Sequence, residues 1–155
     1  VLMKEYSFSN AVIAIGDIKT RKKVYDKIKS YELKFPDIVD ASAQFFSREI
    51  NNYGTIIYPN VVIMNGCSIG RFTLVNSGST LGHDVTIGDF CNINPGVNLA
   101  GNITIGNNTL IGIGSTVKEK VAIGSNVIIG AGSVVINNIP DNAVAYGVPA
   151  KQQFI

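Results

Sequence analysis

Residues 57–135 read, in blocks of six, IYPNVV IMNGCS IGRFTL VNSGST LGHDVT IGDFCN INPGVN LAGNIT IGNNTL IGIGST VKEKVA IGSNVI IGAGSV V. Each block begins with Ile, Val or Leu, from Ile57 to Val135, and its fifth residue is small or β-branched, from Val61 to Ser133. Two inward positions per hexad are the mark of a hexapeptide parallel β-helix. We predict that three hexads close one triangular coil and that coils stack about 4.8 Å apart through backbone pairing.

The second position of many hexads is occupied by residues that tolerate positive φ. We therefore expect the chain to turn its corners at these positions. They are Gly70, Asn76, Gly82, Gly88, Asn94, Gly106, Gly112, Gly124 and Gly130.

The chain before the repeat has a different pattern. Residues 10–16 (NAVIAIG) predict a short buried strand that ends in glycine, and Asp17 is expected to cap a helix reaching about Tyr31. A second short strand is expected at residues 37–39. A strand, a glycine turn and a helix form half of a nucleotide-binding βαβ unit, so we predict that residues 1–38 are a partial, Rossmann-like α/β segment of the kind that holds nucleotides.

The remainder, residues 39–155, is predicted to be the β-helix domain with a C-terminal tail. Between residues 41 and 55 the hexad register is weak, with Phe45, Phe46 and Ile50 taken as out of phase, which predicts an irregular first coil. After Ile139 the register breaks again, and the sequence IPDNAVAYGVPAK is expected to form the tail.

Composition excludes several classes of protein. The 155 residues are 46% hydrophobic and 15% charged, which fits one elongated domain with a small additional segment. There is no apolar run of about 18 residues and no signal peptide pattern, so we expect a cytoplasmic protein with no membrane partner. Cys67 and Cys91 fall on the inward series without metal-ligand spacing and are expected to be buried, reduced thiols.

A basic cluster precedes the repeat. On a short helix such a run is usually a solvated face, and the aromatic residues of single-strand binders are missing, so no nucleic-acid partner is expected. The cluster comprises Lys19, Arg21, Lys22, Lys23, Lys27 and Lys29.

His83 is the only histidine. It occupies the third position of the hexad LGHDVT, outside both inward series, which leaves a solvated surface histidine or a functional one. Asp84 follows directly, and a neighbouring carboxylate favours the imidazole tautomer that can accept a proton. A general base needs this arrangement where an amine or hydroxyl attacks a carbonyl.

The segment NSGSTLGHDVTIGDFCNINPGVNLAGNITIG (76–106), with AIGDIKTRKK upstream and AYGVPAK near the end, resembles bacterial sugar O- and N-acetyltransferases of the sialic acid O-acetyltransferase type. These hexapeptide-repeat enzymes include those that acetylate UDP-linked 4-amino-sugars for glycan biosynthesis. The resemblance implies a left-handed β-helix, a homotrimer, acetyl-CoA as co-substrate without a metal, and a sugar or nucleotide-linked amino-sugar as acceptor.

The resemblance also implies roles for individual residues. His83 matches the catalytic base, and Asp84 matches its carboxylate partner. Gly101 lies one coil further on and matches the backbone N–H donor that stabilises an oxyanion, although an ordinary corner glycine is an equal alternative. Asn92 stands where relatives often have a second histidine, and its amide is expected to donate a hydrogen bond to the acetyl group or the cofactor.

Four further positions match ligand contacts in the same family. Ile113 and Ala131 match positions that contact acetyl-CoA in a groove between two neighbouring subunits. Gly16 and Asp17 match the side of the site that binds the nucleotide-sugar.

Two alternatives remain beside an acetyltransferase. A hexapeptide-repeat carbonic anhydrase needs three histidines around zinc, which one histidine per chain does not supply. A structural or assembly module, in which coil stacking is itself the function, predicts no outward His–Asp pair and no family-like tail, and this chain has both.

Overall fold

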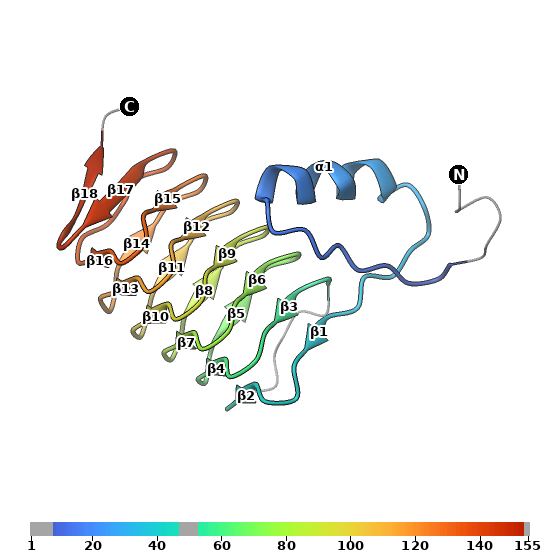
Figure 1. The fold of residues 1–155 in the computed structure, drawn as a ribbon, viewed down its shortest axis with the longest axis horizontal. Coiled ribbons are helices and arrows are strands. Elements are labelled where there is room, and N and C mark those ends of the chain that lie inside the picture. The colour runs from blue at the N-terminus through green and yellow to red at the C-terminus, as the bar shows by residue number, and fades with distance from the viewer. Residues whose placement is uncertain (1–7, 47–52, 154–155) are drawn as a thin grey trace.

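The computed structural model describes residues 8–46 and 53–153. Within these ranges, short strands stack into a three-sided prism, and one helix, α1 (Ile18–Ile28), lies along its side (Figure 1). The first face is an eight-stranded sheet of β1 (Ile38–Val39), β3 (Ile56–Ile57), β6 (Leu74–Val75), β9 (Asn92–Ile93), β12 (Leu110–Ile111), β15 (Ile128–Ile129), β17 (Val144–Gly147) and β18 (Ala150–Gln153).

The other two faces complete each coil. The six-stranded sheet contains β2 (Gln44–Phe45), β4 (Val62–Ile63), β7 (Thr80–Leu81), β10 (Asn98–Leu99), β13 (Thr116–Val117) and β16 (Val134–Val135). The four-stranded sheet contains β5 (Ser68–Ile69), β8 (Thr86–Ile87), β11 (Thr104–Ile105) and β14 (Ala122–Ile123). The result is a solenoid of about six turns.

Strand pairing confirms three hexads per coil. Leu81 pairs in parallel with Leu99, and Leu99 pairs with Val117, in the six-stranded sheet. The same spacing recurs on the other faces, until the antiparallel hairpin of β17 and β18 ends the stack.

The core is built from the two predicted inward series, and every member of both, from Ile57 to Ile139, is buried. Most hydroxyls of the inward series donate to a carbonyl of the next coil, as Thr73 Oγ1 does to the Gly88 oxygen at 2.8 Å, and Ser133 donates to the Gly130 oxygen. Cys67 and Cys91 occupy the same series as buried, free thiols, as predicted. Inward hydroxyls and thiols therefore leave no unsatisfied donor and hold adjacent coils together.

The prediction about corners was wrong. Positive φ occurs at the fourth position of the hexads, for example at Asp84 (φ 59°) and Gly114 (φ 67°), and at none of the second-position glycines or asparagines. The second-position glycines have another cause: a Cβ on Gly112 would lie 2.5 Å from the backbone nitrogen of Ala131 in the next coil. Close approach of coils, rather than backbone conformation, requires glycine there.

Three edges separate the faces. The histidine edge (residues 65–66, 83–84, 101–102 and 119–120) lies between the six- and four-stranded sheets. The helix edge (71–72, 89–90, 107–108 and 125–126) lies between the four- and eight-stranded sheets, and the third edge (59–60, 77–78, 95–96, 113–114 and 131–132) lies between the eight- and six-stranded sheets.

The first coil is more regular than expected. Phe45 follows the hexad register, because it pairs with Ile63 of the next coil. The prediction that Phe45 is out of phase was wrong. Phe46 is exposed, as an out-of-phase residue should be, and Ile50 lies outside the described residues. The strand expected at residues 37–39 forms as β1, but it pairs with β3 of the prism.

The segment before the prism differs from the prediction in two respects, the end of its helix and its first strand. Asp17 caps α1 as expected, accepting a hydrogen bond from the Thr20 nitrogen at 2.8 Å, but the helix ends at Ile28. Residues 10–16 form no strand, and only an isolated bridge joins Asn10 to Lys34. No helix within residues 8–46 and 53–153 is long and apolar enough to cross a membrane.

Aromatic rings attach α1 to the helix edge. Phe72 and Phe90 project from corners of successive coils, stack with ring centroids 5.1 Å apart, and receive Tyr25 of α1, whose centroid lies 4.6 Å from that of Phe72. Phe35 joins this separate apolar cluster. The cluster fixes α1 against the middle coils.

Candidate active site

The histidine edge carries the pair expected from the sequence. His83 Nδ1 lies 2.8 Å from Asp84 Oδ2, and the two side chains are 62% and 60% exposed. Asp84 has a φ of 59°, a conformation that Asp tolerates better than most residues. This corner lets two neighbours in sequence bond to each other while the Nε2 nitrogen of the imidazole stays available.

Glycines on either side make room for this pair. A Cβ on Gly66, one coil earlier, would overlap the Asp84 carboxylate, and a Cβ on Gly101, one coil later, would lie 2.7 Å from His83 Cε1. The structure therefore brings His83, Asp84 and Gly101 together, as the sequence predicted. Their catalytic roles stay a prediction.

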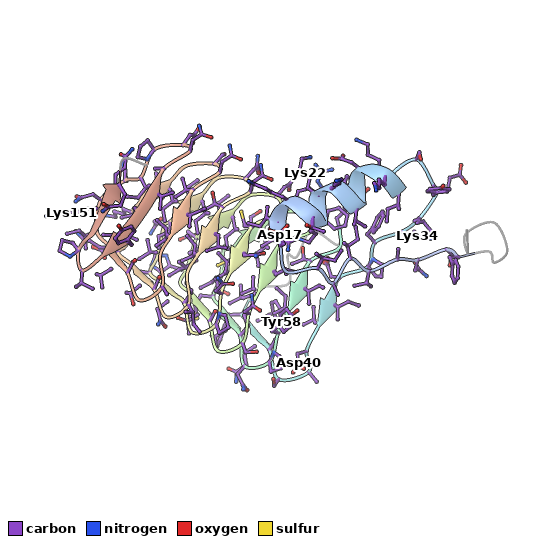
Figure 2. All side chains as sticks on the ribbon, turned by 45° about the horizontal axis from the view of Figure 1, so that its top comes forward. Asp17, Lys22, Lys34, Asp40, Tyr58 and Lys151 are labelled. Atoms are coloured by element: carbon purple, nitrogen blue, oxygen red, sulfur yellow. The ribbon has the colours of Figure 1, made fainter. Side chains whose placement is uncertain are left out.

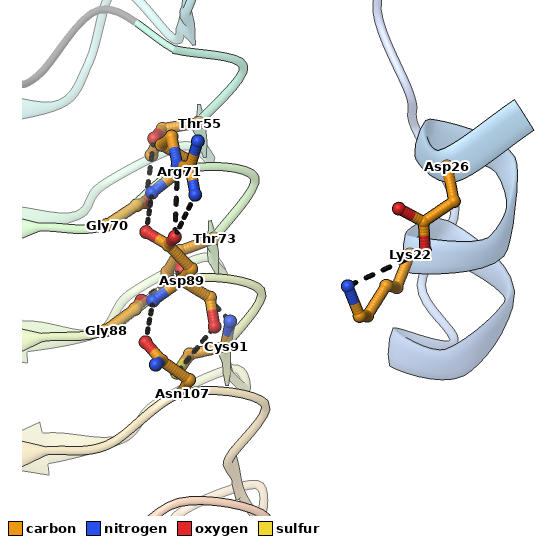
Figure 3. Close-up of polar contacts among 10 residues, drawn as sticks. All are labelled: Lys22, Asp26, Thr55, Gly70, Arg71, Thr73, Gly88, Asp89, Cys91 and Asn107. Carbon is orange, nitrogen blue, oxygen red and sulfur yellow. Dashed lines mark hydrogen bonds and ion pairs between the residues drawn. The ribbon is translucent and has the colours of Figure 1, made fainter. Parts of the chain in front are cut away.

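The Gly101 N–H has no hydrogen-bond partner within the described part of the chain. On the helix edge, the backbone N–H groups at the same hexad position donate to side chains of the next coil. Arg71 N donates to Asp89 Oδ1 at 2.8 Å, and Asp89 N donates to Asn107 Oδ1 at 2.7 Å (Figure 3). Ser125 accepts from Asn107 N in the same way. The histidine edge thus leaves a backbone donor beside the imidazole.

A groove opens at another place, between the first turns of α1 and the prism. It has a volume of about 570 Å³. Figure 2 shows Asp17 and Lys22 at this end of the helix. The groove is lined on the helix side by Gly16, Asp17, Ile18, Lys19 and Lys22. The coils contribute Asn92, Asn108, Leu110, Asn126 and Ile128. The two predicted substrate-binding residues therefore line one groove with Asn92.

Asn92 is engaged by the helix segment. Its Nδ2 donates to the Gly16 oxygen at 2.7 Å, and its Oδ1 accepts from Arg21 NH2 at 2.7 Å. The hydrogen bond to the acetyl group or cofactor expected for Asn92 stays a prediction.

Arg21 is a residue whose environment the sequence reasoning missed. The sequence predicts a solvated basic face that includes Arg21, but its side chain is fully buried, and burial lowers the pKa of its guanidinium to about 10. A signal was present, because Arg21 shares one helix face with Ile18, Tyr25 and Ile28 at spacings of three and four residues.

The other two cofactor positions lie elsewhere. Ile113 and Ala131 occupy the third edge, and Ile113 is 55% exposed. Within one chain they are brought to neither the His83–Asp84 pair nor the groove. Residues 8–46 and 53–153 contain no group of three His, Cys, Asp or Glu side chains that could hold a metal ion.

Comparison with known proteins gives two kinds of match. The family of bacterial transferase hexapeptide (six repeats) matches residues 66–101 and 102–137. The acetyltransferase domain of PglB from Neisseria gonorrhoeae, in complex with acetyl coenzyme A, is 29% identical with a TM-score of 0.91, over 98% of this chain and 75% of that one.

Two further structures are similar over nearly the whole chain. Perosamine N-acetyltransferase from Caulobacter crescentus, as a histidine-to-asparagine mutant in complex with CoA and GDP-perosamine, is 28% identical with a TM-score of 0.86, over 99% of this chain and 73% of that one. WeeI from Acinetobacter baumannii is 26% identical with a TM-score of 0.89, over 96% and 72%.

Proposed function

Because this chain is a hexapeptide-repeat acetyltransferase related to the acetyltransferase domain of PglB and to perosamine N-acetyltransferase, we propose that it transfers an acetyl group from acetyl-CoA to the amine of a nucleotide-linked sugar. The observation that carries the proposal is the exposed His83–Asp84 pair, with the partnerless Gly101 N–H one coil away. A base and an oxyanion donor side by side fit acyl transfer.

Each residue of the histidine edge has a separate role in the proposed transfer. Acetyl-CoA supplies a thioester carbonyl, whose carbon forms the new bond to nitrogen as its bond to sulfur breaks. His83 Nε2 accepts the proton that the attacking amine loses, and returns it to the departing thiolate. Asp84 holds the Nδ1–H tautomer in place, and the Gly101 N–H donates to the carbonyl oxygen as negative charge develops there.

The groove beside α1 supports the acceptor side of the proposal. Lys19 and Lys22 add positive charge to a groove already lined by Gly16 and Asp17, which suits a phosphate-linked sugar. A relative was solved with GDP-perosamine. We propose the same class of acceptor here.

The proposal includes a homotrimer. The histidine edge and the α1 groove lie on different edges of one prism, so one copy must bring its groove to the histidine edge of a neighbour for amine and imidazole to meet. In that arrangement acetyl-CoA lies between the two copies, along Ile113 and Ala131.

Thiol release from acetyl-CoA tests the function directly. The wild-type protein is assayed with GDP-perosamine, a UDP-4-amino-sugar, free amino-sugars and free sialic acid, beside His83→Asn and Asp84→Asn. Release with a nucleotide-linked amino-sugar, reduced about 10²–10⁴-fold in His83→Asn, is expected from loss of a general base. Asp84→Asn keeps the size and tolerates the same φ, so it tests the carboxylate alone.

Release that is unaffected by His83→Asn would overturn the proposed mechanism. Absence of release with every acceptor would overturn the proposed function and favour the structural module. Arg71→Lys, on a different edge, is the control for general effects of substitution on the prism.

A further inference from the structure

The side chain of Arg21 joins two segments that are distant in sequence. It is fully buried, and its NH1 donates to the Ile15 oxygen at 2.6 Å and to the Gly16 oxygen at 3.1 Å. Its NH2 donates to the oxygens of Phe90 and Cys91 at 3.3 and 3.2 Å. One guanidinium therefore bonds to the turn before α1 and to the helix edge of the prism.

Asn92 makes the same connection from the prism side. Its Oδ1 accepts from Arg21 NH2 at 2.7 Å, while its Nδ2 donates to the Gly16 oxygen at 2.7 Å. The Gly16 carbonyl thus receives one hydrogen bond from each of the two side chains. The amide is oriented by both contacts, because its oxygen and nitrogen have different partners.

The hydrogen bond from Asn92 to the Gly16 oxygen joins two residues that line the groove. Gly16 and Asp17 form part of one wall and Asn92 part of the other. The aromatic cluster holds α1 through Tyr25, further along the helix, and Ile15 and Ile18 on either side of the turn also pack against this cluster. The Arg21–Asn92 pair adds the side-chain hydrogen bonds that tie the Gly16 carbonyl itself to the wall that carries Asn92.

We propose that Arg21 and Asn92 are positioning residues that hold the Gly16–Asp17 turn against the prism and thereby set the affinity of the groove for the nucleotide-sugar acceptor. This inference rests on the proposed function. Arginine suits the task because its planar group donates in two directions at once, which a lysine ammonium does not reproduce at the same distances. Neither side chain takes part in bond making at the histidine edge.

Steady-state kinetics of Arg21→Lys and Asn92→Ala test the proposal, with Arg71→Lys as a matched control. Arg71 also makes a forked contact with a coil residue, Asp89, but outside the groove. We expect KM for the acceptor to rise about tenfold or more in both variants, with kcat and KM for acetyl-CoA changed less than about threefold. In the double variant, KM for the acceptor should rise little beyond the larger of the two single effects, because both residues hold the same turn against the prism.

A second measurement, independent of catalysis, reports on the turn at Gly16 directly. Amide hydrogen exchange in residues 15–21 should accelerate in Arg21→Lys and Asn92→Ala and stay unchanged in Arg71→Lys. If the wild-type protein acetylates no acceptor, the proposed function fails, and calorimetric binding of UDP and GDP to the same variants replaces KM as the measure of the groove.

Three results would overturn the proposal. They are unchanged exchange and acceptor affinity in both variants, a fall in kcat with an unchanged acceptor KM, or a rise in KM for acetyl-CoA in Asn92→Ala. The last result would favour the cofactor contact predicted from the sequence.

Discussion

The imidazole of His83 lies over Gly101, so close that a Cβ on this glycine would fall 2.7 Å from Cε1 of the ring. Gly101 has no positive φ to require glycine. The space occupied by the imidazole therefore accounts for the glycine, whatever its role in catalysis.

Gly101→Ala should displace the imidazole without unfolding the prism, because the His83 side chain is 62% exposed and no core residue of the described chain packs on it from the solvent side. We expect kcat to fall by about tenfold or more, as the base leaves its position. Kinetics and thermal denaturation of the same variant check this. In the His83→Ala background the glycine substitution should cause little further loss, and a full additional loss would show that Gly101 acts independently of His83.

Gly112→Ala should destabilise the protein more than Gly78→Ala. The new Cβ at residue 112 meets the backbone of the next coil at 2.5 Å, whereas the one at residue 78 meets nothing within 4 Å but sits at a φ of +68°. We expect the free energy of unfolding to fall by about 3 kcal/mol or more for Gly112→Ala, from overpacking. For Gly78→Ala it should fall by about 1–2 kcal/mol, from backbone strain. Urea unfolding gives both values, and equal losses would contradict the explanation by close approach of the coils.

Phe90→Ala should loosen α1 and lower stability. Phe90 is buried in the cluster that Tyr25 and Phe72 share, so the loss should be about 3–5 kcal/mol, as for other buried aromatic truncations. Chemical denaturation measures the loss, and hydrogen exchange should accelerate in α1 more than in the core strands. Uniform acceleration over the whole chain would contradict a local role for Phe90.

Cys91 should make stability depend on alkaline pH. Burial raises the pKa of its thiol from 9.0 to about 11. The unfolded thiol then ionises first, so this stabilisation is complete below pH 9 and is lost as pH rises towards 11, by about 2–3 kcal/mol. Unfolding of the wild-type protein and of Cys91→Val is compared from pH 8 to 11, because the other titrating groups are common to both. Parallel pH dependences would contradict a buried, protonated Cys91.

Sequence periodicity predicted the prism because its requirement repeats: Ile57 and every sixth residue after it must fill the same interior. The same reasoning misjudged the second-position glycines, since a contact with the next coil leaves no mark within a single hexad. It also placed Arg21 in solvent, because the prism residues to which this charge donates lie 69 or more residues away. The pairing of His83 with Asp84 was predictable because the two are adjacent, whereas the groove depends on how α1 docks.

The helix edge and the histidine edge differ in what holds them. On the helix edge, Asp89, Asn107 and Ser125 each accept a backbone N–H from the coil before, so a change of side chain there disturbs the stack. No such acceptor serves residues 65, 83, 101 or 119 within the described ranges. Natural selection can therefore alter the side chains of the histidine edge at little risk to the scaffold that carries them.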